Sequence, residues 1–182
     1  MDRSSAQADH GKCSEVHSSR RRACSAYLPK SGHRLIDPEL LLLLSLKPGF
    51  AEAILRGVKT VELRRQRVAL APGAAVLIYA SSPVMAIIGT ARVRDVERAD
   101  PQQIWARHSA SVALTREEYD AYLRGVDFVS AITLEMPALL DSPVTLQQLR
   151  GEQPFHPPQS YCFVSPSSPG TIGVLSSKLA VT

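Results

Sequence analysis

Hydrophobic residues occur in short runs separated by turn residues, a pattern that predicts several strands and short helices. The continuous apolar run at 40–46 is typical of a buried strand. Residues 60–65 alternate instead, which places Val61 and Leu63 on one face of a strand. Further strands are expected over residues 76–80, 84–93, 128–135 and 160–164.

Four short helices are expected where capping residues flank the apolar positions. Residues 48–56 carry apolar side chains at i,i+4 spacing between Pro48 and Gly57. The other three helices begin at N-caps, which are Asp100 before Pro101, Thr115 with Glu118, and Thr145 with Gln148. Strands and helices follow one another without a repeated βαβ unit. This order predicts an α+β domain built on a small, mixed or barrel-like sheet.

Charge is distributed unevenly along the 182 residues, whose net charge is +4. Residues 1–37 hold seven Lys/Arg, four Asp/Glu and few large apolar residues, so we expect a disordered basic leader. Residues 38–165 are expected to form the folded domain, and residues 166–182 a flexible tail. Because the folded part is nearly neutral, nucleic acid would have to bind a local patch. The candidate patch is Lys59, Arg64, Arg65 and Arg67.

Composition argues against several classes of protein. No run approaches the ~20 apolar residues that span a bilayer, and no apolar core of a signal peptide is present. Three cysteines are too few for a disulfide scaffold. Cys13, His17, Cys24 and His33 lack the compact spacing of zinc ligands. We therefore expect a cytoplasmic protein with no membrane contact, no metal site and no cofactor.

The alternating strand at 60–65 carries the most informative polar residues. Thr60, Glu62 and Arg64 share the face opposite Val61 and Leu63. Charged residues on one strand face are rarely buried unless they are paired. Two interpretations remain open, namely a solvent-exposed face with a weak Glu62–Arg64 contact, or a polar cleft that Lys59 also enters.

Two segments resemble the signature of ASCH domains, which belong to the PUA-like superfamily of small β-barrels with flanking helices. They are Ser45-Leu46-Lys47-Pro48 and Ile54-Leu55-x-Gly57-x-Lys59-Thr60-x-Glu62-x-Arg64. Residues 78–84 and 157–162 resemble a subgroup of predicted transcriptional regulators, and the whole resemblance spans residues 40–164. It implies a mixed β-barrel whose cleft, lined by Lys59, Glu62 and Arg64, binds RNA, a modified base or a nucleotide-like ligand.

The chemistry of these residues agrees with such a ligand. Lys59 and Arg64 can contact phosphates or base edges, and Glu62 can accept exocyclic N–H groups. Tyr79 would supply a stacking face, although it also fits a core position, and Lys47 suits either a cleft rim or a helix cap. The other candidates, with hydroxyl donors, are Ser81 and Ser82. The first hypothesis is a nucleic-acid-binding module for RNA, a single strand or a modified base, with a regulatory role.

The same family resemblance also implies an enzymatic alternative. Small ASCH members hydrolyse acylated cytidine with a Lys, a Thr three residues later and a Glu, but Glu62 stands here where that Thr is expected. Lys59 would then be the base, Thr60 the nucleophile and Glu62 the orienting group. Other members are ribonucleases, which need an acid and a base with a pKa near 7. His108 and His156 are expected to be structural or solvated, so catalysis stays an open question, as does a protein-interaction role for the loop at 154–159.

Overall fold

Six strands form one sheet in the computed structural model, which describes residues 41–151, 154–165, 168 and 170–180. The expected leader and the Cys and His residues within it lie outside these described residues. Across the sheet the order is β2-β5-β4-β3-β1-β6, with β1 parallel to β3 and the other neighbouring pairs antiparallel. The strands are β1 (Leu41–Leu46), β2 (Val61–Arg64), β3 (Ala75–Ala80), β4 (Ala86–Ala99), β5 (Val129–Thr145) and β6 (Tyr161–Val164).

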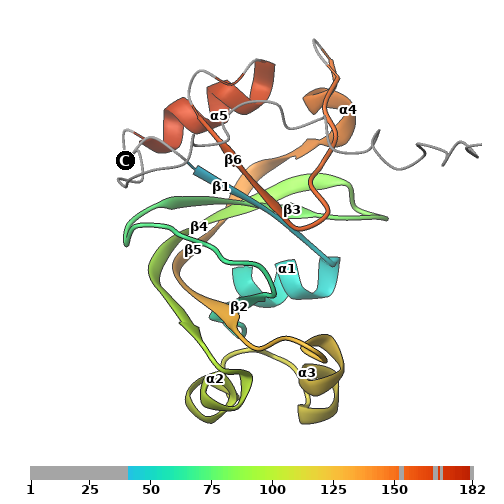
Figure 1. Cartoon of the computed structure of the whole chain (residues 1–182). Coiled ribbons are helices and arrows are strands. Elements are labelled where there is room, and N and C mark those ends of the chain that lie inside the picture. Colours follow the sequence, from blue (N-terminus) through green and yellow to red (C-terminus); the bar gives the residue numbers. More distant parts are fainter. Residues whose placement is uncertain (1–40, 152–153, 166–167, 169, 181–182) are drawn as a thin grey trace, which may run out of the picture.

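Five helices flank the sheet in the described part of the chain, and Figure 1 shows α2 and α3 at one end of it and α4 and α5 at the other. The caps expected from the sequence are confirmed: Asp100 Oδ1 accepts the Gln102 N–H at 2.7 Å, and both capping boxes form. Over the described residues no helix is both long and apolar enough to cross a membrane. The helices are α1 (Pro48–Leu55), α2 (Pro101–His108), α3 (Arg116–Tyr122), α4 (Leu146–Leu149) and α5 (Gly170–Ala180).

Strand β1 consists of leucines at every position except Ser45, because both of its faces are covered. Leu42, Leu44 and Leu46 belong to an inner cluster, which also includes Ile54 of α1. Leu41 and Leu43 belong to an outer cluster that includes residues of α4 and α5. A strand buried on both faces favours apolar residues at nearly every position, so its sequence shows no alternation of apolar and polar residues.

The sheet is strongly curled (Figure 1), with β2 and β6 as its outermost strands. Side chains link the β2 end of the sheet to β1 and β6. Arg64 Nη2 donates to the Ser45 carbonyl of β1 at 3.3 Å, and the Tyr161 hydroxyl of β6 donates to the carbonyl of Arg67, just after β2, at 2.9 Å. The structure therefore confirms the expected α+β fold, a mixed and barrel-like sheet with short helices around it.

Helix α1 lies close to the sheet because β4 carries a glycine beneath it. A Cβ atom at Gly89 would collide with the Leu55 side chain of α1 and lie 2.6 Å from the Ala138 carbonyl oxygen. The helix ends at a turn in which Gly57 has a φ of +73°, a conformation that favours glycine. These two glycines fix where the chain leaves α1 and enters β2.

The structure differs from the expectations in its long strands and at its C-terminal end. β4 and β5 continue to Ala99 and Thr145, beyond the expected ends at 93 and 135. Residues 170–180, expected to be part of a flexible tail, form α5 instead. That helix packs Ile172, Leu175 and Leu179 against the outer cluster, and this burial stabilises it despite its Ser- and Gly-containing sequence.

We expect Tyr119 to make the protein less stable above pH 10. Its ring is fully buried, its hydroxyl donates to the Pro101 carbonyl at 2.8 Å, and burial raises its pKa to about 12. Between pH 10 and about 12 the folded state keeps a proton that the unfolded state releases, so the free energy of unfolding falls as pH rises. Urea unfolding of the unsubstituted protein and Tyr119→Phe, followed by circular dichroism from pH 8 to 11.5, measures this. A stability difference that does not shrink above pH 10 would contradict the assignment.

Candidate functional site

The polar residues singled out in the sequence lie where α1 leads into β2. Val61 and Leu63 pack into an end cluster with residues of α2, α3 and β5. The period of two then directs Glu62 and Arg64 to the opposite face of β2. Lys59 reaches the same place from the turn after α1, where its backbone N–H donates to the Ala53 carbonyl.

Lys59, Glu62 and Arg64 form a buried ion cluster, which we call the central cluster. Glu62 Oε2 lies 3.3 Å from Lys59 Nζ, and Glu62 Oε1 lies 3.1 Å from Arg64 Nη2. The three residues are only 3%, 6% and 7% exposed, respectively. The polar face of β2 is thus not a solvated surface with a weak ion pair, because both carboxylate oxygens are engaged by buried cations.

The ammonium group of Lys59 is fully bonded. Its Nζ donates to the Val61 carbonyl at 2.8 Å and to the Val112 carbonyl at 2.6 Å, in addition to its pairing with Glu62. Burial lowers the pKa of Lys59, and the adjacent Glu62 raises it in opposition. Nζ also lies 5.4 Å from the ring centroid of Phe50. Three acceptors around three N–H bonds favour an electrostatic role for Lys59 over that of a proton acceptor.

Arg64 keeps one donor without a partner. Its Nη2 serves Glu62 and the Ser45 carbonyl, but its buried Nε has no acceptor among the described residues. A buried N–H without a partner is unfavourable by about 1–3 kcal/mol. The central cluster also holds two cations and one anion. An additional anionic acceptor, a phosphate or a carboxylate, would satisfy both the donor and the excess charge.

Two tyrosines that the sequence analysis did not select lie near Arg64. The Tyr122 hydroxyl donates to the Leu63 carbonyl at 3.3 Å, and Tyr161 contacts the Arg67 carbonyl as described above. Burial raises the pKa of both phenols, while Arg64 lowers it. Tyr122 comes from α3 and Tyr161 from β6, so only the three-dimensional fold brings them to β2.

The remaining candidates from the sequence lie elsewhere. Tyr79 is 2% exposed and packs in the outer cluster. Burial raises the pKa of its phenol, and the positive charge of Arg150 partly offsets this increase. Ser81 begins the turn after β3, and its N–H donates to the Leu46 carbonyl at 2.8 Å. Ser82 in that turn and Lys47 at the N-cap of α1 are both exposed.

Thr60 and the histidines complete the predicted set. The Thr60 N–H donates to the Ser111 carbonyl, and its own carbonyl accepts the Leu134 N–H, which fixes the start of β2. His108 Nε2 lies 2.9 Å from Glu97 on the α2 side of the molecule, whereas His156 is an exposed loop residue. Within the described ranges no three His, Cys, Asp or Glu residues are grouped to hold a metal ion.

Comparison with known proteins identifies similar sequences and structures. A family model for a domain of unknown function, DUF365, matches residues 45–150. A Zymomonas mobilis protein named ASCH domain-containing ribonuclease is 36% identical over 118 residues, which are 64% of this chain and 79% of that relative. The crystal structure of ASCH from Zymomonas mobilis has a TM-score of 0.66 at 29% identity and covers 80% of this chain and 95% of its own. A substituted form of that protein has a TM-score of 0.64 at 33% identity, with 68% and 87% covered.

Proposed function

Since this chain belongs to the ASCH domain family, we propose that it binds single-stranded RNA, with one phosphate held by Arg64 of the central cluster. The observation that carries the proposal is the buried Arg64 Nε without an acceptor in a cluster of net positive charge. The choice of RNA is supported by the Zymomonas relative, whose name is that of a ribonuclease.

The geometry of the central cluster suits a phosphate. The Nε and Nη donors of an arginine form a planar fork that can bind two phosphate oxygens at once. In Arg64 the Nη2 donors are engaged by Glu62 and the Ser45 carbonyl, so the side chain is already oriented and its Nε remains as a donor for a phosphate oxygen. Lys59 adds positive charge. Tyr122, 40% exposed and near Arg64, offers an aromatic surface on which an unpaired base can stack.

We expect Arg64→Lys to weaken RNA binding about tenfold, within the 1–3 kcal/mol typical of one lost arginine contact. The substitution keeps the charge that pairs with Glu62 but removes the Nε donor and the planar fork. Fluorescence anisotropy with a labelled 12-nucleotide oligouridine, repeated over a range of salt concentrations, measures the affinity. The salt dependence should correspond to only a few phosphates, because the folded part of the chain is nearly neutral.

Arg56→Ala is the matched control for this experiment. Arg56 is exposed and pairs weakly with Glu52 at 3.7 Å, so its removal subtracts one positive charge without touching the central cluster. Its affinity should stay within twofold of that of the unsubstituted protein. If Arg64→Lys and Arg56→Ala bind alike while both melt normally, Arg64 does not hold the phosphate.

RNA cleavage is the second candidate, because the relative at 36% identity is named a ribonuclease. We propose that Lys59 and Arg64 would then stabilise negative charge at the scissile phosphate, while Glu62 orients both cations. Incubating end-labelled RNA with the protein and with Lys59→Met separates the candidates. Cleavage abolished in Lys59→Met supports the enzyme, whereas binding without turnover supports a regulatory role.

Hydrolysis of acylated nucleosides has weaker support. It would require Lys59 to accept a proton and Thr60 to attack, yet Lys59 Nζ is surrounded by three acceptors that hold its ammonium form. Release of free nucleoside from N-acylcytidine, lost in Thr60→Val, would restore this alternative.

A further inference from the structure

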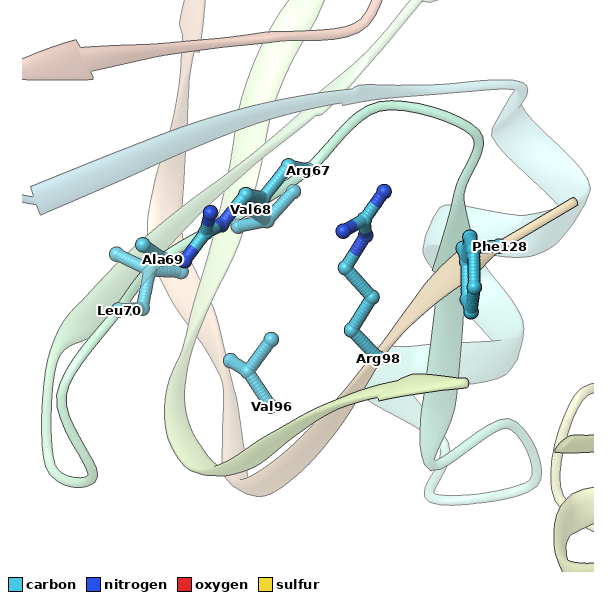
Figure 2. A pocket seen from close by; sticks show the side chains of 7 residues that line it. All are labelled: Arg67, Val68, Ala69, Leu70, Val96, Arg98 and Phe128. Atoms are coloured by element: carbon cyan, nitrogen blue, oxygen red, sulfur yellow. The ribbon is translucent and has the colours of Figure 1, made fainter. Parts of the chain in front are cut away.

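A second positively charged site lies next to the central cluster. An open hollow of about 460 Å³ is lined by side chains from the segment after β2, from β4 and from Phe128, the residue just before β5. Figure 2 shows the guanidinium groups of Arg67 and Arg98 on two sides of this hollow, with Val96 below them in the view and Phe128 beside Arg98. We call it the arginine groove, and its main lining residues are Arg67, Val68, Leu70, Val96, Arg98 and Phe128.

The two arginines of the groove are available to a ligand. Both are exposed, and neither forms an ion pair with any residue that the structure describes. The Arg98 guanidinium carbon lies 5.0 Å from the centre of the Phe128 ring, a cation–π contact that holds the guanidinium beside the hollow. Two positive groups without acidic partners complement a phosphate.

The rest of the groove is suited to a base. Val68 and Leu70 are buried and Val96 is partly buried, so these side chains give the hollow an apolar floor between the charged groups. Phe128 is 51% exposed, and its ring lies beside the Arg98 guanidinium at the side of the hollow. Exposed rings beside arginines are the surfaces on which unpaired bases stack.

We propose that the arginine groove binds a second nucleotide of the same RNA strand, with its phosphate between Arg67 and Arg98 and its base against Phe128. This inference rests on the proposed RNA-binding function. Arg67 follows Arg64 by three residues, which span at most roughly 10 Å of extended chain. The two sites are therefore close enough for one strand to occupy both.

Binding of the labelled 12-nucleotide oligouridine to the full chain tests the groove. Arg67→Ala/Arg98→Ala should weaken binding about tenfold and lower the slope of log affinity against log salt by about 0.7, the value for one phosphate on a single strand. Phe128→Leu should weaken binding by a similar factor, and Phe128→Tyr, which keeps the ring, should not. All these side chains are exposed, and Tyr161 contacts only the backbone of Arg67, so the variants should fold.

A crosslinking experiment locates the base directly. Oligouridine carrying 5-iodouridine, irradiated in complex with the protein, should crosslink to Phe128. After trypsin digestion the crosslink should be found on the peptide 125–150, and the Phe128→Leu variant should lose it. Unchanged affinity and salt slope in the groove variants, alongside loss of binding in Arg64→Lys, would overturn the groove and leave the central site intact. Failure of the unsubstituted protein to bind oligouridine would overturn both proposals.

Discussion

Replacing Glu62 with glutamine is expected to lower the free energy of unfolding by about 3–5 kcal/mol. The carboxylate is the anionic partner of both Lys59 and Arg64, and all three side chains are less than a tenth exposed. A neutral amide would leave two buried cations beside each other without a counter-charge. Urea unfolding at pH 7, followed by circular dichroism, gives the change directly.

Two variants show whether burial causes this effect. Glu52→Gln removes an equally charged residue whose side chain is 55% exposed and pairs with Arg56 at 3.7 Å, so it should change stability by less than about 0.5 kcal/mol. Lys59→Met should be less harmful than Glu62→Gln, because it leaves the Glu62–Arg64 pair neutral. A Glu62→Gln protein as stable as Glu52→Gln would show that the central cluster is hydrated rather than buried.

Ile104→Ala is expected to destabilise the protein by about 2–5 kcal/mol, since it leaves a cavity where a large side chain was fully buried. Ile104 of α2 packs in the end cluster with Val112 and Tyr119. The carbonyl of Val112 accepts a hydrogen bond from Lys59, so packing at Ile104 also supports one wall of the central cluster. Urea unfolding measures the stability, and anisotropy with oligouridine measures whether the site loosens.

Two milder substitutions in α2 serve as controls for the stability loss expected of Ile104→Ala. Ile104→Val should cost only about 0.5–1.5 kcal/mol, because it removes a single methylene from the end cluster. Gln103→Ala, one residue away on the exposed side of α2, should change stability by less than about 0.5 kcal/mol. Equal stabilities for Ile104→Ala and Gln103→Ala would mean that α2 does not pack tightly on the sheet.

The sequence was sufficient for elements whose structure depends on nearby residues. The capping boxes at Thr115 and Thr145 predicted helices because both partners lie within one turn. Alternation around Val61 placed Glu62 and Arg64 on a common face for the same local reason. The order of elements predicted a small, mixed or barrel-like sheet, and the ASCH resemblance narrowed this to a PUA-like barrel.

Features that depend on residues far apart in the sequence could not be predicted from local patterns. β5 passes through Pro137 and Pro143 and stays a strand because it pairs along β4, although such residues normally interrupt strands. Arg98 meets Phe128 only because β4 pairs with the start of β5. Residue spacing also could not show whether the face that carries Glu62 is buried. The carbonyls of Val112 and Ser45, which accept hydrogen bonds from Lys59 and Arg64 there, come from parts of the chain far from β2 in the sequence.

The hydrogen bonds at and just after β2 have a consequence for the behaviour of this protein at high concentration. Outermost strands with free backbone groups are templates on which other chains add, which leads to aggregation. Here the Ser111 carbonyl accepts the N–H groups of Thr60 and Val61, and the Tyr161 hydroxyl donates to the carbonyl of Arg67, just after β2. Backbone groups at and just after β2 are therefore already engaged, which makes this edge a poorer template for intermolecular sheet formation.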